Sequence, residues 1–170
     1  MALTLSIAVP STLQFAFLWV ATAFRRDASI ILSGEWWRIF TALFVQDGDV
    51  GGSVFNILSL LLLGVVMETL GGPIRLLLLF FIGGIGSELI ALVWQPVGAG
   101  NSVGNFSVAA GVAIACLGRT SSFPAKVGSC LIFAVGLVLL LVHDIHGAAV
   151  GIGTLVSLGM NWKTQRSCDH

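Results

Sequence analysis

Apolar residues gather into six long runs along the chain, separated by polar stretches that are mostly short. Each run is roughly 20 residues long, which is the length that an α-helix needs to cross the hydrocarbon core of a bilayer. Pro10, inside the first run, predicts a kink there. The pattern predicts six membrane-spanning helices, at about residues 3–24, 54–70, 74–94, 102–117, 125–142 and 143–160.

The first connection, residues 25–53, is the exception to the short loops. It mixes aromatic side chains with polar ones, a composition typical of segments that lie at the membrane–water interface. We therefore expect an interfacial loop here. Its aromatic and basic members include Trp36, Trp37, Arg38, Phe40 and Phe44.

Composition supports a membrane protein. Hydrophobic residues make up 56% of the 170 positions and charged residues only 9%, whereas soluble domains carry roughly 25% charged residues. The fold class expected is therefore all-α: a polytopic bundle of six transmembrane helices forming one membrane domain over residues 1–170. The net charge is zero and no basic block suggests nucleic acid as a partner. Cys116, Cys130 and Cys168 lack metal-site spacing, and Cys116 and Cys130, low in their helices near the cytosol, are expected to be free thiols.

The distribution of basic residues predicts the orientation. With the N-terminus in the cytoplasm, the inside segments hold five basic residues and the outside segments three, which agrees with the positive-inside rule. Arg25 and Arg26, next to the first helix on the outside, argue for the opposite orientation. The start of the chain lacks a basic region and a cleavage site, so we interpret it as the first spanning helix rather than a signal peptide. The inside residues are Arg75, Arg119, Lys126, Lys163 and Arg166, and the outside residues are Arg25, Arg26 and Arg38.

A polar, glycine-rich stretch, residues 100–106, opens the fourth apolar run. Ser102 within it is a candidate nucleophile at the start of a helix, where free backbone N–H groups can bind a developing oxyanion. The alternative is a helix N-cap, a role that serine often has. The pattern Gly-x-Ser-x-Gly is weak by itself, because 21 glycines in the chain generate it by chance.

His146 is the candidate general base, since ionisable groups inside a membrane indicate function and imidazole can accept a hydroxyl proton. His143 is the rival, one turn nearer the outside. His146 is the deeper of the two, and small residues follow it at helical spacing, which would let another helix approach closely. These small residues are Gly147, Ala149, Gly151 and Gly153.

Other polar residues fall at the same depth. At about 1.5 Å per residue from the cytoplasmic helix ends, Ser102 stands roughly 24 Å up, and Asn56 and His146 roughly 21 Å. Asn56 either donates its amide to an oxyanion or caps its helix. Phe106, one turn below Ser102, either packs under His146 or belongs to ordinary core. Glu88 has a similar height and is either a paired buried acid or the wall of a water cavity; no catalytic role is assigned to it.

Several short motifs occur in a fixed order. Trp37-Arg38 lies in the long loop, and Asn56 opens a helix that ends in Glu68-Thr69-Leu70-Gly71-Gly72. Gly100-Asn101-Ser102 follows, with an aromatic residue four positions after the serine, and then His146 with small residues three and seven positions later. Together these motifs resemble the rhomboid family of intramembrane serine proteases, over most of the chain from Glu35 to about Gly153.

The resemblance implies a hydrolase that cuts transmembrane segments of other membrane proteins. Ser102 and His146 would act as a catalytic dyad without a carboxylate, and the oxyanion would meet the Ser102 N–H and the Asn56 amide. Gly100, Phe106, Trp37, Arg38, Gly147 and Gly151 would support the site. The resemblance implies no metal and no cofactor, and a multi-pass protein of the bacterial plasma membrane.

Two positions depart from the family's pattern. Gly52 stands where the family usually has a histidine, four residues before the helix-two asparagine, and Val103 stands where it has glycine. Losing one oxyanion donor lowers the rate about 10²–10³-fold in a soluble protease. The alternative function is therefore a catalytically weak or inactive relative that binds membrane clients.

Overall fold

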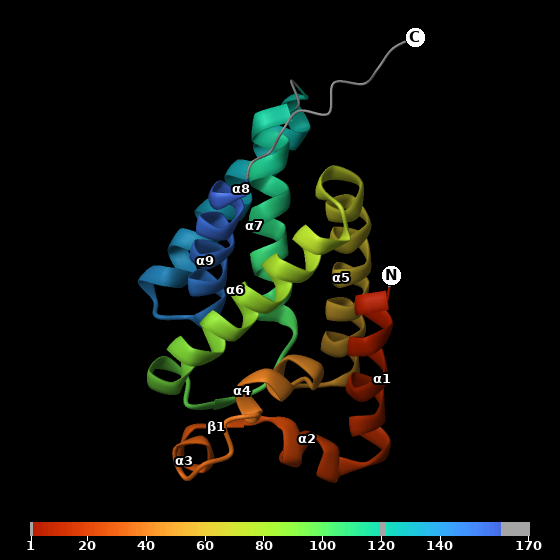
Figure 1. Ribbon diagram of the computed structural model, residues 1–170, viewed down its shortest axis with the longest axis vertical. Helices are drawn as coiled ribbons and strands as arrows, with labels where there is room; N and C mark the ends of the chain where they lie inside the picture. The colour runs from red at the N-terminus through yellow and green to blue at the C-terminus, as the bar shows by residue number, and fades with distance from the viewer. Residues whose placement is uncertain (1, 120–121, 161–170) are drawn as a thin grey trace.

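The computed structural model describes residues 2–119 and 122–160, which form a helical bundle (Figure 1). Two two-residue strands are the only β-structure in this part of the chain, and turns and short loops connect the helices. The order of elements is α1 (Ala2–Ala16), α2 (Leu18–Phe24), β1 (Arg26–Asp27), α3 (Ala28–Leu32), α4 (Arg38–Thr41), η1 (Ala42–Phe44), α5 (Val50–Gly71), α6 (Pro73–Trp94), β2 (Val97–Gly98), α7 (Ser102–Arg119), α8 (Phe123–Leu141) and α9 (Ile145–Gly159).

Within the described residues, four helices are long and apolar enough to cross a membrane: α5, α6, α7 and α8. The apolar helices α1 and α9 are shorter. The expected all-α polytopic architecture is confirmed. The expectation of one helix over residues 3–24 is not met, because α1 runs unbroken past Pro10 and the chain leaves the helical conformation at Phe17 (φ −129°, ψ 88°).

A tight turn of three residues, 142–144, separates α8 from α9, whereas the two helices were expected to follow one another directly at residues 142 and 143. His143, expected as the first residue of the sixth helix, has φ 58° and lies outside any helix. Asp144 then caps α9, its side chain accepting a hydrogen bond from the His146 N–H. The short turn explains why α8 and α9 pack against each other.

Three helices, α6, α7 and α9, pack mutually at the centre of the bundle. Their contact surfaces are rich in small residues, and α7 is buried along one whole side. Larger apolar side chains from α1, α5 and η1 complete the core around them. The helix α7, which begins with Ser102, is therefore the most enclosed of the four long helices.

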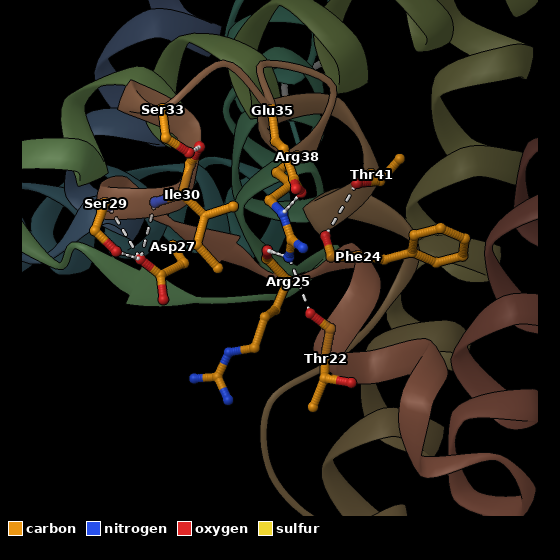
Figure 2. A network of polar contacts seen from close by, with 10 residues as sticks. All are labelled: Thr22, Phe24, Arg25, Asp27, Ser29, Ile30, Ser33, Glu35, Arg38 and Thr41. Atoms are coloured by element: carbon orange, nitrogen blue, oxygen red, sulfur yellow. Dashed lines mark hydrogen bonds and ion pairs between the residues drawn. The ribbon is translucent and has the colours of Figure 1, made fainter.

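The segment 25–53 is folded, and Figure 1 shows its helices gathered with β1 at one end of the bundle. Arg38 holds it in place and is 8% exposed. Figure 2 shows its guanidinium reaching Glu35 through Nε at 2.6 Å and the carbonyls of Thr22 and Arg25 through Nη1 at 2.9 and 3.1 Å. By contrast, Trp36 and Trp37 are more than half exposed, as interfacial aromatic residues would be.

A second arginine of this segment is fully buried. Arg26 and Glu88 form an ion pair, and both side chains are almost inaccessible to solvent. Arg26 also belongs to β1, which pairs antiparallel with β2 and places Arg26 opposite Gly98. Of the two alternatives for Glu88, the paired buried acid is therefore the one observed. The ion pair therefore connects the interfacial segment to the last two turns of α6, the helix that precedes α7.

Candidate active site

Ser102 is the first residue of α7, and its hydroxyl does not cap the helix. The first backbone hydrogen bond of the helix runs from the Asn105 N–H to the Asn101 carbonyl at 3.0 Å, so Asn101 occupies the cap position. The Ser102 Oγ instead lies 2.8 Å from Nε2 of His146. The capping alternative for Ser102 is therefore wrong, and the structure brings this hydroxyl to the imidazole of α9.

His146 is the second residue of α9 and is held on both sides of its ring. Its Nδ1 lies 2.6 Å from Oδ1 of Asp144, and the same oxygen accepts the His146 backbone N–H at 2.8 Å. Oδ2 of Asp144 accepts a longer hydrogen bond of 3.4 Å from the Gln95 side chain. The expectation of a pair without a carboxylate did not include Asp144, which completes the contact series Ser102–His146–Asp144.

The carboxyl group of Asp144 lies in the turn before α9, outside the spanning helices. Burial acts to raise its pKa, but the hydrogen bonds from the backbone and the ring of His146 outweigh burial. The pKa of Asp144 therefore lies below its ordinary value of 3.8. This carboxyl is ionised at neutral pH.

Two aromatic contacts distinguish the histidines. The ring of Phe106 packs on His146, with centroids 4.9 Å apart and planes tilted by 57°. His143 instead meets Trp94 edge to face at 5.1 Å. The aromatic neighbour of His146 thus comes from α7, the helix that also carries its hydrogen-bond partner Ser102, whereas the neighbour of His143 comes from α6.

Asn56 lies inside α5 and is not its cap. The helix begins at Val50 and is capped by Asp49, whose Oδ1 accepts the Gly52 N–H at 2.8 Å. The carbonyl of Asn56 accepts a hydrogen bond of 2.9 Å from the side chain of Asn105 on α7. Asn105, which no sequence pattern singled out, therefore links Asn56 to α7 one turn after Ser102.

A cavity of about 220 Å³ adjoins the Ser102–His146 pair. Its wall includes Val103, the position where glycine was expected, and the buried Arg26. The chain at Gly98 passes so close to Arg26 that a Cβ there would lie 2.5 Å from Nη2. The remaining lining residues are Asp47, Gln95, Val97, Ala99, Gly100 and Ile145.

Gly100 allows a second close approach beside the hydroxyl. A Cβ at Gly100 would stand 3.0 Å from the Ser102 Oγ and 3.2 Å from Oε1 of Gln46. Gln46 is itself fixed by Gln14 of α1, which accepts its N–H and donates to its carbonyl, both at 2.9 Å. Gln46 is thus a neighbour of the site that sequence patterns did not reveal, because its approach depends on α1.

The small residues of α9 have different neighbours from those expected. Gly147 faces α8, where a Cβ would lie 2.2 Å from the Leu140 backbone N, and Gly151 faces open space. Ala149, fully buried, and Gly153 are the ones turned to the bundle interior. The roles expected for Gly147 and Gly151 in bringing His146 to Ser102 are therefore corrected.

Other residues singled out in the sequence lie away from the cavity or outside the described residues. Trp37 and Arg38 belong to the interfacial segment and not to the cavity wall. Cys116 and Cys130 are free, whereas Cys168, Lys163 and Arg166 fall outside the described residues. Among residues 2–119 and 122–160, no three His, Cys, Asp or Glu side chains gather where a metal ion could bind.

Comparison with known proteins identifies similar chains. A family model described as the Rhomboid domain matches residues 33–162. Rhomboid protease GluP of Bacillus subtilis (strain 168) is 28% identical over 111 residues, covering 65% of this chain and 22% of that protein. Rhomboid protease AarA of Providencia stuartii is 32% identical over 71 residues, covering 42% of this chain and 25% of that protein. The chain thus spans about a quarter of the length of these relatives.

Proposed function

The chain belongs to the rhomboid family and is an integral multi-pass membrane protein, and from this premise we propose that it is an intramembrane serine protease. The observation that carries the proposal is the 2.8 Å contact between the Ser102 Oγ and Nε2 of His146 beside a cavity. Both relatives bear the name rhomboid protease, which agrees with it.

The proposed reaction uses these two groups in turn. Ser102 Oγ attacks the scissile carbonyl while His146 Nε2 accepts the hydroxyl proton. His146 then returns that proton to the leaving amine as the C–N bond breaks, leaving an acyl ester on Ser102. Water, deprotonated by His146, hydrolyses the ester and restores the hydroxyl. The hydrogen bond present between the two side chains is the contact that the first step requires.

The oxyanion would be stabilised by backbone N–H groups at the start of α7. The first turn of any helix leaves such donors without intrahelical partners. Asn56 is the proposed side-chain donor, and its link to α7 through Asn105 supports its placement on this side of the bundle. Gly52, an exposed glycine whose N–H is used by Asp49, supplies no side-chain donor.

The proposed substrates are transmembrane segments of other membrane proteins. Two apolar cavities of about 200 Å³ flank Phe106, one towards α8 and one towards α5. Apolar openings beside the reacting pair favour an occupant that comes from the lipid. Segments that unwind readily, with small residues at the cut, fit best because a scissile bond inside a helix is shielded.

We also propose that the protein resides in a bacterial plasma membrane with its N-terminus in the cytoplasm. The positive-inside count supports this orientation. The strongest contrary residues were Arg25 and Arg26, and Arg26 is buried in an ion pair within the bundle rather than free in a loop. The reacting pair then lies towards the outer face.

A second candidate is a non-catalytic binder of membrane clients with the same fold. Gly52 and Val103 favour it, since the first removes a side-chain donor and the second changes the residue after the serine. The Ser102–His146 contact favours the protease, because a binder has no need to align a hydroxyl with an imidazole.

Cleavage of a model transmembrane substrate in liposomes tests the choice. The wild type is expected to produce a defined product, Ser102→Ala and His146→Ala none, and His143→Ala nearly the wild-type amount. His143→Ala is the matched control, a nearby imidazole that contacts Trp94 instead. Equal product from the wild type and Ser102→Ala contradicts the protease and leaves the binder.

A further inference from the structure

We propose that Asp144 is a positioning residue for the reaction: it holds the His146 ring towards Ser102 and stabilises the imidazolium that forms when the ring takes the serine proton. The inference rests on the proposed function. It turns the expected pair into a three-residue series of serine, histidine and aspartate.

The geometry fixes the tautomer of the ring. Because Nδ1 lies 2.6 Å from a carboxylate oxygen, the ring proton belongs on Nδ1. Nε2 is then free to accept a proton, and it is the atom that faces the Ser102 Oγ. In soluble serine proteases the buried aspartate has this same effect on its histidine.

The place of His146 in α9 explains why a carboxylate matters here. It is the second residue of the helix, at the positive end of the helix dipole. That field disfavours a positive imidazolium, as it does for histidines elsewhere at helix N-termini. The negative charge of Asp144, in direct contact with the ring, opposes the field.

The carboxylate is itself held in place. Gln95, which follows α6, donates to its second oxygen at 3.4 Å. The carbonyl of Gln95 in turn accepts Nε of Arg26 at 3.0 Å. Asp144 is thus connected to the buried Arg26–Glu88 pair through one residue, and its orientation does not depend on α9 alone.

Other charged groups near the cavity are engaged elsewhere. Arg26 is paired with Glu88, and Asp47 lies 3.9 Å from Arg25. His143 contacts Trp94. Among the described residues near the cavity, Asp144 is therefore the charged side chain bonded to the His146 ring.

The test compares the rate of fluorophosphonate labelling with pH in the wild type and in Asp144→Asn. Asparagine can still cap α9 but carries no charge. At neutral pH we expect Asp144→Asn to lower the labelling rate. The lower bound is about tenfold, the effect of a base weaker by one pKa unit, and the upper bound is about 10⁴-fold, the effect of the equivalent substitution in a soluble triad. The acidic limb of the rate profile is expected to move to lower pH, because the imidazolium has lost its counter-charge.

Asp49→Asn is the matched control, since Asp49 caps α5 through the same kind of contact and touches neither reacting group. It is expected to change neither the rate nor the profile. Asp144→Ser, which caps but cannot reach the ring, repeats the test with different packing and should behave as Asp144→Asn.

Wild-type rates and an unmoved profile in Asp144→Asn and Asp144→Ser contradict the inference. A loss that is uniform at every pH also contradicts it, since that is the result of a purely structural cap. A wild type that does not react contradicts the protease itself, and with it this role, whereas an active wild type with unaffected variants contradicts only the role of Asp144.

Discussion

Gly153 of α9 lies against the backbone of Ser107 of α7: a Cβ built on Gly153 would stand 2.5 Å from the Ser107 carbonyl oxygen. On the other side of Ser107, a Cβ on Gly83 of α6 would stand 1.9 Å from its Oγ. The Ser107 hydroxyl donates to the Leu79 carbonyl at 2.7 Å. The helices that carry Ser102 and His146 are thus in backbone contact below the site, which sets their separation.

The first prediction concerns this contact. Gly153→Ala should lower the free energy of unfolding by about 1–3 kcal/mol, because the new methyl group must push α9 away from a backbone atom. Substrate cleavage should fall by more than tenfold, since the same displacement lengthens the Ser102–His146 contact. Thermal unfolding in detergent and cleavage assays measure the two effects.

Gly151→Ala is the control for that substitution, on the same helix but facing open space. It should leave cleavage unchanged and stability equal or slightly higher, because alanine favours helix over glycine. Similar losses in both variants would show that glycine at these positions matters for reasons other than contact with α7.

A second prediction concerns the space beside the serine. Gly100→Ala places a methyl group 3.0 Å from the Ser102 Oγ, which must turn away or shift. Cleavage should drop by about tenfold or more while the melting temperature changes little, since the neighbour on the other side, 3.2 Å away, is the far end of the flexible Gln46 side chain and can move by a few tenths of an ångström. Gly118→Ala, in α7 with nothing within 4 Å of the new methyl group, should behave as the wild type. Wild-type cleavage by the Gly100→Ala variant would contradict the expectation.

The buried ion pair gives a third prediction. Glu88→Gln leaves the Arg26 guanidinium buried without its counter-charge, and the expected loss of stability is about 3–5 kcal/mol. The double variant Arg26→Met, Glu88→Leu should recover much of this loss. Arg25→Met, which breaks a partly exposed pair with Asp47, should cost about 1 kcal/mol or less. Equal losses for Glu88→Gln and Arg25→Met would contradict the burial argument.

A fourth prediction follows from the lowered pKa of Asp144. A carboxyl whose folded pKa is depressed stabilises the fold above its unfolded value, here 3.8, and the contribution disappears as pH falls through the folded value. The melting temperature of the wild type should therefore exceed that of Asp144→Asn at about pH 5, where the Asp144 carboxyl is ionised in both the folded and the unfolded chain. The difference should shrink as the pH falls below about 4, and a difference that widens between about pH 5 and pH 3 would contradict the lowered pKa.

Hydrophobic periodicity predicted most of the helices, because long apolar runs have few alternatives in a membrane. The run expected at 74–94 is α6 almost residue for residue. The division at Phe17 could not be predicted, since neither glycine nor proline stands there and α2 owes its direction to the contacts of Arg38 and Thr41 with its last turn. Arg26 was assigned to a loop because burial of a charge depends on a distant partner.

The pairing of Ser102 with His146 could be predicted from depth, because two polar groups at one height in neighbouring helices have a reason to meet. The face of α9 that turns to α7 could not be predicted, because Gly147 with Gly151 and Ala149 with Gly153 have the same spacing of four residues. Asp144 carried a readable signal, an aspartate directly before an apolar helix. It was missed because the helix was expected to begin at His143, two residues before the observed start at Ile145, which put Asp144 inside the helix rather than at its cap.

Mapping a fluorophosphonate adduct by mass spectrometry tests the central claim most directly. The protein in detergent or liposomes is treated at neutral pH, digested and sequenced, with Ser102→Ala and His146→Ala alongside. A single adduct on Ser102, absent from both variants, is the predicted result. An adduct on another serine, or equal labelling in the wild type and Ser102→Ala, would contradict the assignment of Ser102 and His146 as the reacting pair.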